Sequence, residues 1–275
     1  MLNQVDFEKL QKTQLEIMDE VHRVCLENNL NYYIIGGTAL GAKRHNGFIP
    51  WDLDIDIAMP RYDYEKFAEI CKKEFNERFF YCSYKEYDYH LSPHALVYIK
   101  NTCLINKFDK YNSIPKHFEI YLDIFPLDNA PDDIKLREKQ AKRLKMIKEL
   151  KKIKVCYMHN NKFIVKLIKK ILQKLLFFIS LKKINERQSL IMQTYNNCDT
   201  ECLCSMGSHY SYKKQCMPRE TYGKPMLIQF GGRKYYGPEN IDEYLSRIYG
   251  DYMKLPPVEQ RQANLKIFEK VILGK

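Results

Sequence analysis

Three aspartates alternate with three aliphatic residues in the stretch WDLDIDIAMP, which begins at Trp51. Successive side chains of a β-strand point to opposite faces of the sheet, so the alternation predicts a strand over 52–59 with its carboxylates on one face. Leu53, Ile55 and Ile57 fall on the other face, where they can be buried. Carboxylates this close together resist ionisation unless water or a cation stabilises them. The stretch is therefore either a half-buried strand with a polar outer face or part of a metal site.

A glycine pair precedes this strand in the phrase YYIIGGTALGAKRHNG, residues 32–47. The phrase predicts a short apolar strand, a turn at Gly36 and Gly37, and a helix whose N-cap is Thr38. Glycines let the backbone approach a ligand closely, and helix N-termini bind phosphate. We expect the two strands to pair antiparallel, so that this phosphate loop faces the carboxylates. Arg44, near the end of the helix, is a further candidate for contact with phosphate.

Two of the alternating aspartates and one distant aspartate form the candidate metal set. Asp54 and Asp56 share the polar face of the predicted strand, and Mg²⁺ prefers a few carboxylates together with phosphate and water oxygens. The phrase EIYLDIFPLD places Asp123 inside an otherwise apolar strand, where a carboxylate is costly to bury unless it is paired or bound to a metal. The alternative is that Asp123 ends a strand and bonds to a turn. Asp128 follows Pro126 and is interpreted as a turn residue.

Hydrophobic periodicity divides the chain into three parts. In the first, 1–131, an amphipathic helix over 6–29 and several short strand-like runs predict an α/β fold with a mixed α+β sheet. The second part, 132–196, is lysine-rich, contains no glycine or proline, and is helical by its pattern. The third part, 197–275, mixes turn signals with a final amphipathic helix and is expected to complete the catalytic domain. The strand-like runs are 79–84, 95–100 and 119–125.

The phrases quoted above resemble the LicD family, whose enzymes transfer phosphocholine from CDP-choline to sugars of bacterial cell-surface glycans. The long phrase over 36–67 carries most of the resemblance, and LDIFPLDNAP and YGDYMKLPP reinforce it. The resemblance implies a nucleotidyltransferase-like core with a helical insertion. It also implies that Asp54, Asp56 and Asp123 bind the metal and carry the catalysis.

The chain departs from the family pattern at two positions. The family usually reads W-D-D-D-I-D, whereas this chain has Leu53 in the middle of the run. Leu53 falls on the face opposite the aspartates, so we expect the metal site to survive. Asn264 stands where the family often has histidine, which leaves the role of that position open.

The resemblance further implies CDP-choline as the donor, a hydroxyl group of a lipid-linked glycan precursor as the acceptor, and Mg²⁺ as the cofactor, with Mn²⁺ as the alternative ion. Teichoic acid and lipooligosaccharide are the candidate acceptors, and no nucleic-acid partner is expected. Quaternary ammonium groups bind in aromatic cages, so Trp51, Tyr222, Tyr235 and Tyr249 are candidates for contact with choline. Two other functions stay open: a nucleotidyltransferase that moves a nucleoside monophosphate, and a catalytically inactive scaffold on a membrane or on RNA.

The chain carries a formal net charge of +11, which favours an anionic partner. Residues 162–184 have the basic amphipathic pattern either of a helix on an anionic membrane surface or of a helix that packs its apolar stripe on the domain. No apolar run reaches the ~18 residues of a spanning helix, and the polar start of the chain lacks an apolar signal segment. We therefore predict a cytoplasmic protein, peripheral on the inner face of the cell membrane if 162–184 binds lipid.

Overall fold

The computed structural model describes residues 4–106, 119–155, 172, 174–176, 178–259, 261 and 268–273. The helices are α1 (Gln4–Glu27), α2 (Gly36–His45), α3 (Arg61–Glu74), α4 (Ile134–Val155), α6 (Leu181–Met192), η2 (Gln193–Tyr195), α7 (Tyr212–Gln215), α8 (Arg219–Tyr222) and α9 (Ile241–Tyr249). The strands are β1 (Tyr33–Ile34), β2 (Asp56–Pro60), β3 (Phe79–Cys82), β4 (Ala95–Ile99), β5 (Cys103–Asn106), β6 (Ile120–Ala130), β7 (Cys202–Cys204), β8 (Cys216–Pro218), β9 (Met226–Phe230), β10 (Arg233–Gly237) and β11 (Phe268–Ile272).

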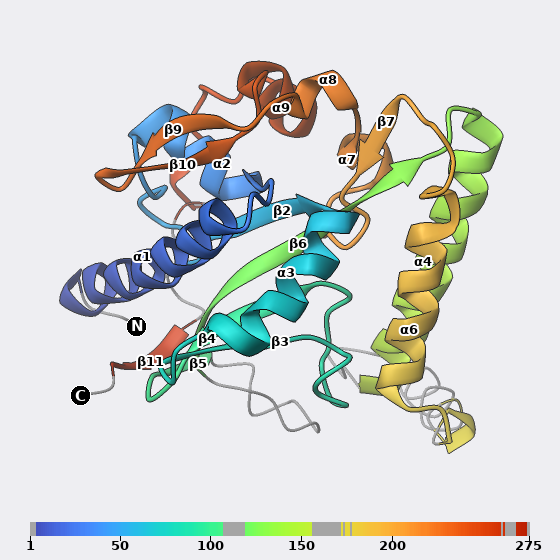
Figure 1. Ribbon diagram of the computed structural model, residues 1–275, viewed down its shortest axis with the longest axis horizontal. Coiled ribbons are helices and arrows are strands. Elements are labelled where there is room, and N and C mark those ends of the chain that lie inside the picture. Colours follow the sequence, from blue (N-terminus) through green and yellow to red (C-terminus); the bar gives the residue numbers. More distant parts are fainter. Residues whose placement is uncertain are drawn as a thin grey trace.

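A mixed seven-stranded sheet holds the fold together, with β1-β2-β6-β4-β3 side by side and β7 and β8 continuing from β6. β2 and β6 run parallel, whereas β1 pairs antiparallel with β2, and β4 antiparallel with β6. Helices α1 and α3 lie together over this sheet, and the β9–β10 hairpin lies against α2 (Figure 1). The predicted α/β fold and the antiparallel pairing of the glycine strand with the aspartate strand are confirmed.

Helix α1 covers the sheet with the apolar stripe that its sequence predicts. Leu10, Ile17, Val21 and Val24 are fully buried in the main core. Burying such side chains is worth about 1.5–3 kcal/mol each relative to exposure, so α1 anchors the sheet that carries the aspartates.

The aspartate strand is shorter than its alternation predicts. Leu53, Ile55 and Ile57 are buried as expected, but β2 begins only at Asp56. The backbone bonds that the Asp123 N–H donates to Ile55 and that Ile35 donates to Asp56 mark the end of the pairing. Beyond this point the chain that forms β1 turns into α2, so no neighbouring strand remains on that side to pair with 52–54.

Two local predictions are wrong. The N-cap of α2 is Ile35, which has no capping side chain, and Thr38 lies inside the helix, where its hydroxyl accepts a 2.8 Å bond from the Asp56 N–H. Asp128 is not in a turn: it lies in β6 and is completely buried. Strand β6 continues past Pro126 because β7 pairs with it at 128–130, a contact between segments about 70 residues apart that local patterns cannot reveal.

The lysine-rich part of the chain contributes α4 and α6, which pack side by side at one end of the sheet (Figure 1). Most of the predicted helix over 162–184 lies outside the described residues, as does Asn264. Within its described part, Leu175 and Phe178 are exposed, at 69% and 87%. No helix in the described part of the chain combines the length and the apolar character needed to span a membrane.

The last amphipathic helix of the described residues is α9, which buries Tyr244, Leu245 and Ile248. After it the chain returns as β11, which pairs antiparallel with β5 and was not predicted.

Candidate metal centre and ligand cavities

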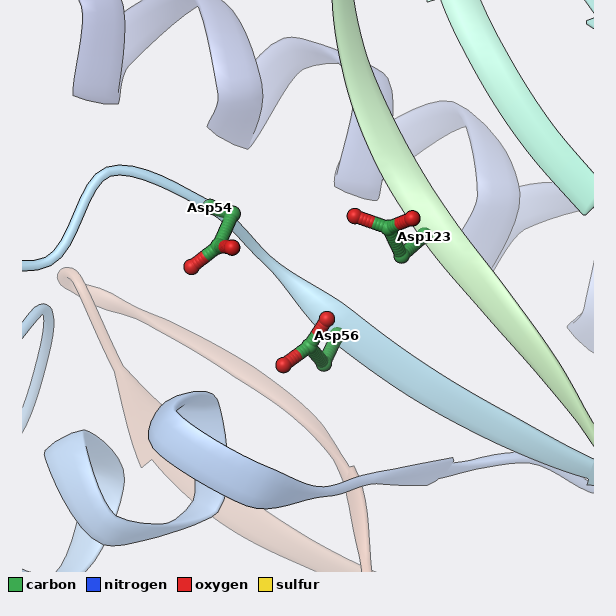
Figure 2. A group of neighbouring side chains, drawn as sticks. All are labelled: Asp54, Asp56 and Asp123. Carbon is green, nitrogen blue, oxygen red and sulfur yellow. The ribbon is translucent and has the colours of Figure 1, made fainter. Parts of the chain in front are cut away.

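Three carboxylates meet where β2 and β6 lie side by side. Asp54 comes just before β2, Asp56 is its first residue, and the parallel register places Asp56 opposite Asp123 of β6. Each contributes one carboxylate oxygen to a group whose members all lie within 4.8 Å of one another (Figure 2). The structure thus brings together the three residues that the sequence singles out as metal ligands.

The carboxylate group carries negative charge that the protein does not neutralise. Burial raises the pKa of Asp54 well above its ordinary value, and repulsion from Asp56, Asp52 and Asp123 raises it further. The pKa of Asp56 is raised well above its ordinary value in the same way, by burial first and then by Asp123 and Asp52. Among the described residues, no lysine or arginine forms an ion pair with Asp54 or Asp56. A divalent cation would supply the missing positive charge.

The glycine pair lets the first turn of α2 lie against these carboxylates. A Cβ on Gly37 would lie 2.3 Å from Asp52 Oδ2, and one on Gly36 would lie 3.0 Å from Asp56 Oδ2. Gly36 also has a φ of +54°, a backbone conformation that residues with a Cβ rarely adopt. The first amides of a helix lack intrahelical partners and carry partial positive charge, so they suit an anionic ligand. In α2 the Gly36 N–H already donates to the Tyr244 hydroxyl at 2.9 Å, so this property falls to Gly37. Thr38 is buried and holds β2 against this turn.

A cavity of about 700 Å³ opens beside the carboxylates, within the size range of small-molecule sites. We call it the acidic cavity. Of the residues predicted to contact the donor, Gly37, Arg44, Trp51 and Tyr249 line it. It is also lined by Asp52, Asp54 and Asp56, together with His209, Tyr210, Asp251, Tyr252 and Lys254.

Two of the four aromatic residues predicted to contact choline do not line this cavity. Tyr222 and Tyr235 are each 1% exposed, and Tyr235 donates a 2.6 Å hydrogen bond to Asp19. They belong to the core. Tyr210, which the sequence did not single out, lines the cavity instead, and its hydroxyl bonds to that of Tyr249 at 3.1 Å. With 21 tyrosines in the chain, composition gave no signal that separates these roles.

His94 is a second residue that sequence reasoning missed. Its Nε2 donates a 2.8 Å hydrogen bond to Asp123 Oδ1, and its ring centre lies 4.0 Å from that of Phe125. It immediately precedes β4, the antiparallel neighbour of β6, which is how it reaches Asp123. No motif surrounds it, so only this pairing identifies it.

A family model and a curated relative both assign the chain to the same family. Residues 29–131 match the family model described as LicD/FKTN/FKRP, nucleotidyltransferase domain. The chain is 30% identical over 255 residues to the lipopolysaccharide cholinephosphotransferase LicD of Haemophilus influenzae, an alignment that covers 90% of this chain and 91% of that protein. An uncharacterized protein of Rickettsia typhi is 28% identical over 121 residues, an alignment that covers 44% of this chain and 36% of that protein. An uncharacterized protein of Rickettsia prowazekii is 33% identical over 128 residues, an alignment that covers 41% of this chain and 44% of that protein.

Proposed function

The chain belongs to the LicD family, and on that premise we propose that it transfers phosphocholine from CDP-choline to a hydroxyl group of a cell-surface glycan precursor. Membership of the family makes it a transferase. The Haemophilus relative is named for lipopolysaccharide, so we propose a lipooligosaccharide-type acceptor first, with teichoic acid as the alternative. The observation that carries the proposal is the grouping of Asp54, Asp56 and Asp123, of which Asp54 and Asp56 line a cavity large enough for a nucleotide.

We propose Mg²⁺ as the cofactor, with Mn²⁺ as the alternative. The donor set fits such an ion because it consists of carboxylate oxygens that lie close together, and no lysine or arginine among the described residues pairs with Asp54 or Asp56. Asp54, Asp56 and Asp123 would hold it. When bound, the ion supplies positive charge to the phosphoryl oxygens and to the CMP leaving group.

The side chains around the acidic cavity have separate tasks in this proposal. The backbone of α2 at Gly37 and the Arg44 guanidinium contact the donor phosphates, and Trp51 and Tyr249 contact choline. The acceptor oxygen attacks the phosphorus that carries choline, and the bond from that phosphorus to the oxygen of CMP breaks. Asp123 takes the hydroxyl proton, and His94 keeps Asp123 in position through its 2.8 Å bond.

A nucleotidyltransferase is the first alternative, because the same carboxylates would serve transfer of the nucleoside monophosphate. Product labelling separates the two: choline label on the glycan supports our proposal, and cytidine label on the glycan supports the alternative. An inactive scaffold is the second alternative. The retained carboxylate set argues against it, and a protein that bound neither Mg²⁺ nor any cytidine nucleotide would favour it.

A thermal-shift screen tests the donor directly, because a ligand that binds the native state raises the unfolding temperature. CDP-choline with Mg²⁺ is expected to raise it more than ADP-linked or UDP-linked compounds do. An equal response to all of them, or no response to CDP-choline, would contradict the proposed donor.

We also propose that the enzyme works at the inner face of the cell membrane, where a lipid-linked acceptor is presented. The net charge of +11, the basic pattern of 162–184 and the exposure of Leu175 and Phe178 support this location.

A further inference from the structure

A second cavity, of about 520 Å³, adjoins the acidic cavity, and His209 lines both. We call it the basic cavity. It lies between the lysine-rich helices α4 and α6 and the sheet, and its polar and basic lining includes His94, Lys148, Lys151, Gln188 and His209. Since His94 lines this cavity and is bonded to Asp123, the basic cavity lies next to the carboxylate group.

Two half-buried lysines in the basic cavity have only neutral partners. Lys151 Nζ donates to the side-chain oxygens of Asn185 and Gln188, the latter at 2.8 Å. Lys148 Nζ donates to the Ser208 carbonyl oxygen at 2.9 Å. No carboxylate in the described part of the chain pairs with either lysine. Burial, and then the charge of Lys148, lower the pKa of Lys151 to about 7, and burial also lowers the pKa of Lys148.

Two buried polar atoms in the lining have no hydrogen-bond partner. One is Nε2 of Gln188, a side chain that is completely buried and whose oxygen is already engaged by Lys151. The other is Nδ1 of His94, which is 9% exposed. Buried polar groups in native proteins are nearly always bonded, so these two atoms indicate a polar ligand. Leu91, Pro93 and Phe125 add an apolar wall, which suits the face of a sugar ring.

We propose that the basic cavity is the acceptor site and that the acceptor glycan carries a phosphate group next to the sugar that is modified. This inference rests on the proposed function and names the class of acceptor. Lys148 and Lys151 bind the phosphate group, the Gln188 amide donates to it, and the sugar lies along Phe125. The acceptor hydroxyl then reaches Asp123 past His94, and the donor enters from the acidic cavity.

The test compares Lys148→Met and Lys151→Met with Lys142→Met, which removes the same charge from an exposed position of α4. Acceptors are a phosphorylated oligosaccharide and its dephosphorylated form. K148M and K151M are expected to raise KM for the phosphorylated acceptor about 10-fold or more, with little change in kcat or in the thermal shift by CDP-choline with Mg²⁺. K142M is expected to match the wild type. Equal effects on both acceptors, or no effect on either, would overturn the inference.

Calorimetry with a hexose phosphate, the neutral hexose and inorganic phosphate separates the acceptor site from the proposed function. If the hexose phosphate binds tightly, the other two ligands do not, and K148M loses this binding, the result supports a sugar-phosphate site. If the wild type shows this binding but does not transfer phosphocholine, only the proposed function fails. Binding of inorganic phosphate as tightly as hexose phosphate would overturn the assignment to a glycan. Because K148M and K151M change different contacts, misfolding of one leaves the other as the test.

Discussion

The acidic cavity and the basic cavity carry opposite charges, but in both of them charged side chains lack a partner of opposite charge. Asp54 and Asp56 have no cationic partner, and Lys148 and Lys151 have no carboxylate partner, among the described residues. Elsewhere the protein balances a buried charge internally: Arg61 and Asp128 form a two-bond ion pair at 2.8 and 2.6 Å. The comparison indicates that an internally paired charge serves the fold, whereas an unpaired cluster at a cavity serves a ligand.

The largest expected effect lies in the acidic cavity. Asp54→Asn or Asp56→Asn keeps the side-chain size but removes a charged ligand, so activity is expected to fall by about 10³-fold or more at saturating Mg²⁺. The apo protein is expected to keep its fold or gain stability, since repulsion within the group is relieved. Turnover measured with labelled CDP-choline checks this, with the exposed Asp88→Asn as control. Near-normal turnover in either variant would remove the proposed metal site.

The internally paired charge makes the contrasting prediction, because its loss should affect folding. Arg61→Met leaves Asp128 buried and unpaired, which is expected to lower the free energy of unfolding by about 3–5 kcal/mol in urea titrations. Arg61→Met combined with Asp128→Leu removes both charges and is expected to recover most of the loss. If the single change cost no more than the double change, the pair would not have the structural role that we assign to it.

The acidic cavity was predictable because its main residues stand out locally. Asp54 and Asp56 alternate with residues that prove to be buried, and Asp123 interrupts an apolar strand. The same local patterns placed most of the sheet. The local patterns failed at Thr38, predicted as an N-cap, because its hydroxyl bonds to β2. They failed at Asp128, predicted in a turn, because β7 and Arg61, both far away in the sequence, hold it in β6.

The basic cavity was not predictable from the sequence. Lys148 and Lys151 lie on a lysine-rich helix, α4, where Lys142 is simply exposed. What distinguishes Lys151 is its contact with Asn185 and Gln188, which lie 34 and 37 residues further along the chain. A charge run does not reveal which of its members a tertiary contact will bury, so only the packing of α4 against α6 separates them.

His94 lines the basic cavity and is bonded to Asp123, and its loss is expected to have the next largest effect on activity. Because it orients Asp123, His94→Ala is expected to lower kcat/KM about 10–100-fold and to raise the Mg²⁺ concentration needed for half-maximal rate. His94→Gln places an amide N–H near the position of Nε2 and is expected to recover part of the activity. If His94→Ala changed neither quantity, the bond to Asp123 would have no part in the reaction.

The buried lysine of the basic cavity predicts a pH dependence of stability. Between about pH 7 and the ordinary lysine pKa of 10.5, the unfolded chain holds a proton at Lys151 that the folded chain has lost. The free energy of unfolding should therefore rise with pH from this group, by at most about 1.4 kcal/mol per pH unit. Urea titrations at pH 7, 8 and 9 check this. In Lys151→Met the rise should be smaller than in the wild type or in the control Lys142→Met, and identical slopes in all three would contradict it.

The smallest expected effect on folding concerns Leu175 and Phe178, near the end of the basic segment 162–184. Both are exposed, so replacing both by Asp is expected to change the free energy of unfolding by only about 0.5 kcal/mol and to leave transfer to a water-soluble acceptor intact. The variant is nevertheless expected to lose binding to anionic liposomes, because it removes apolar contact and adds negative charge beside lysines that each gain about 1 kcal/mol at such a surface. Flotation of wild type and variant at low and high salt measures this, and neutral liposomes serve as the control. A wild-type protein that does not float at either salt concentration would show that the segment does not bind lipid, and an insoluble variant would show that these two side chains pack on the protein instead.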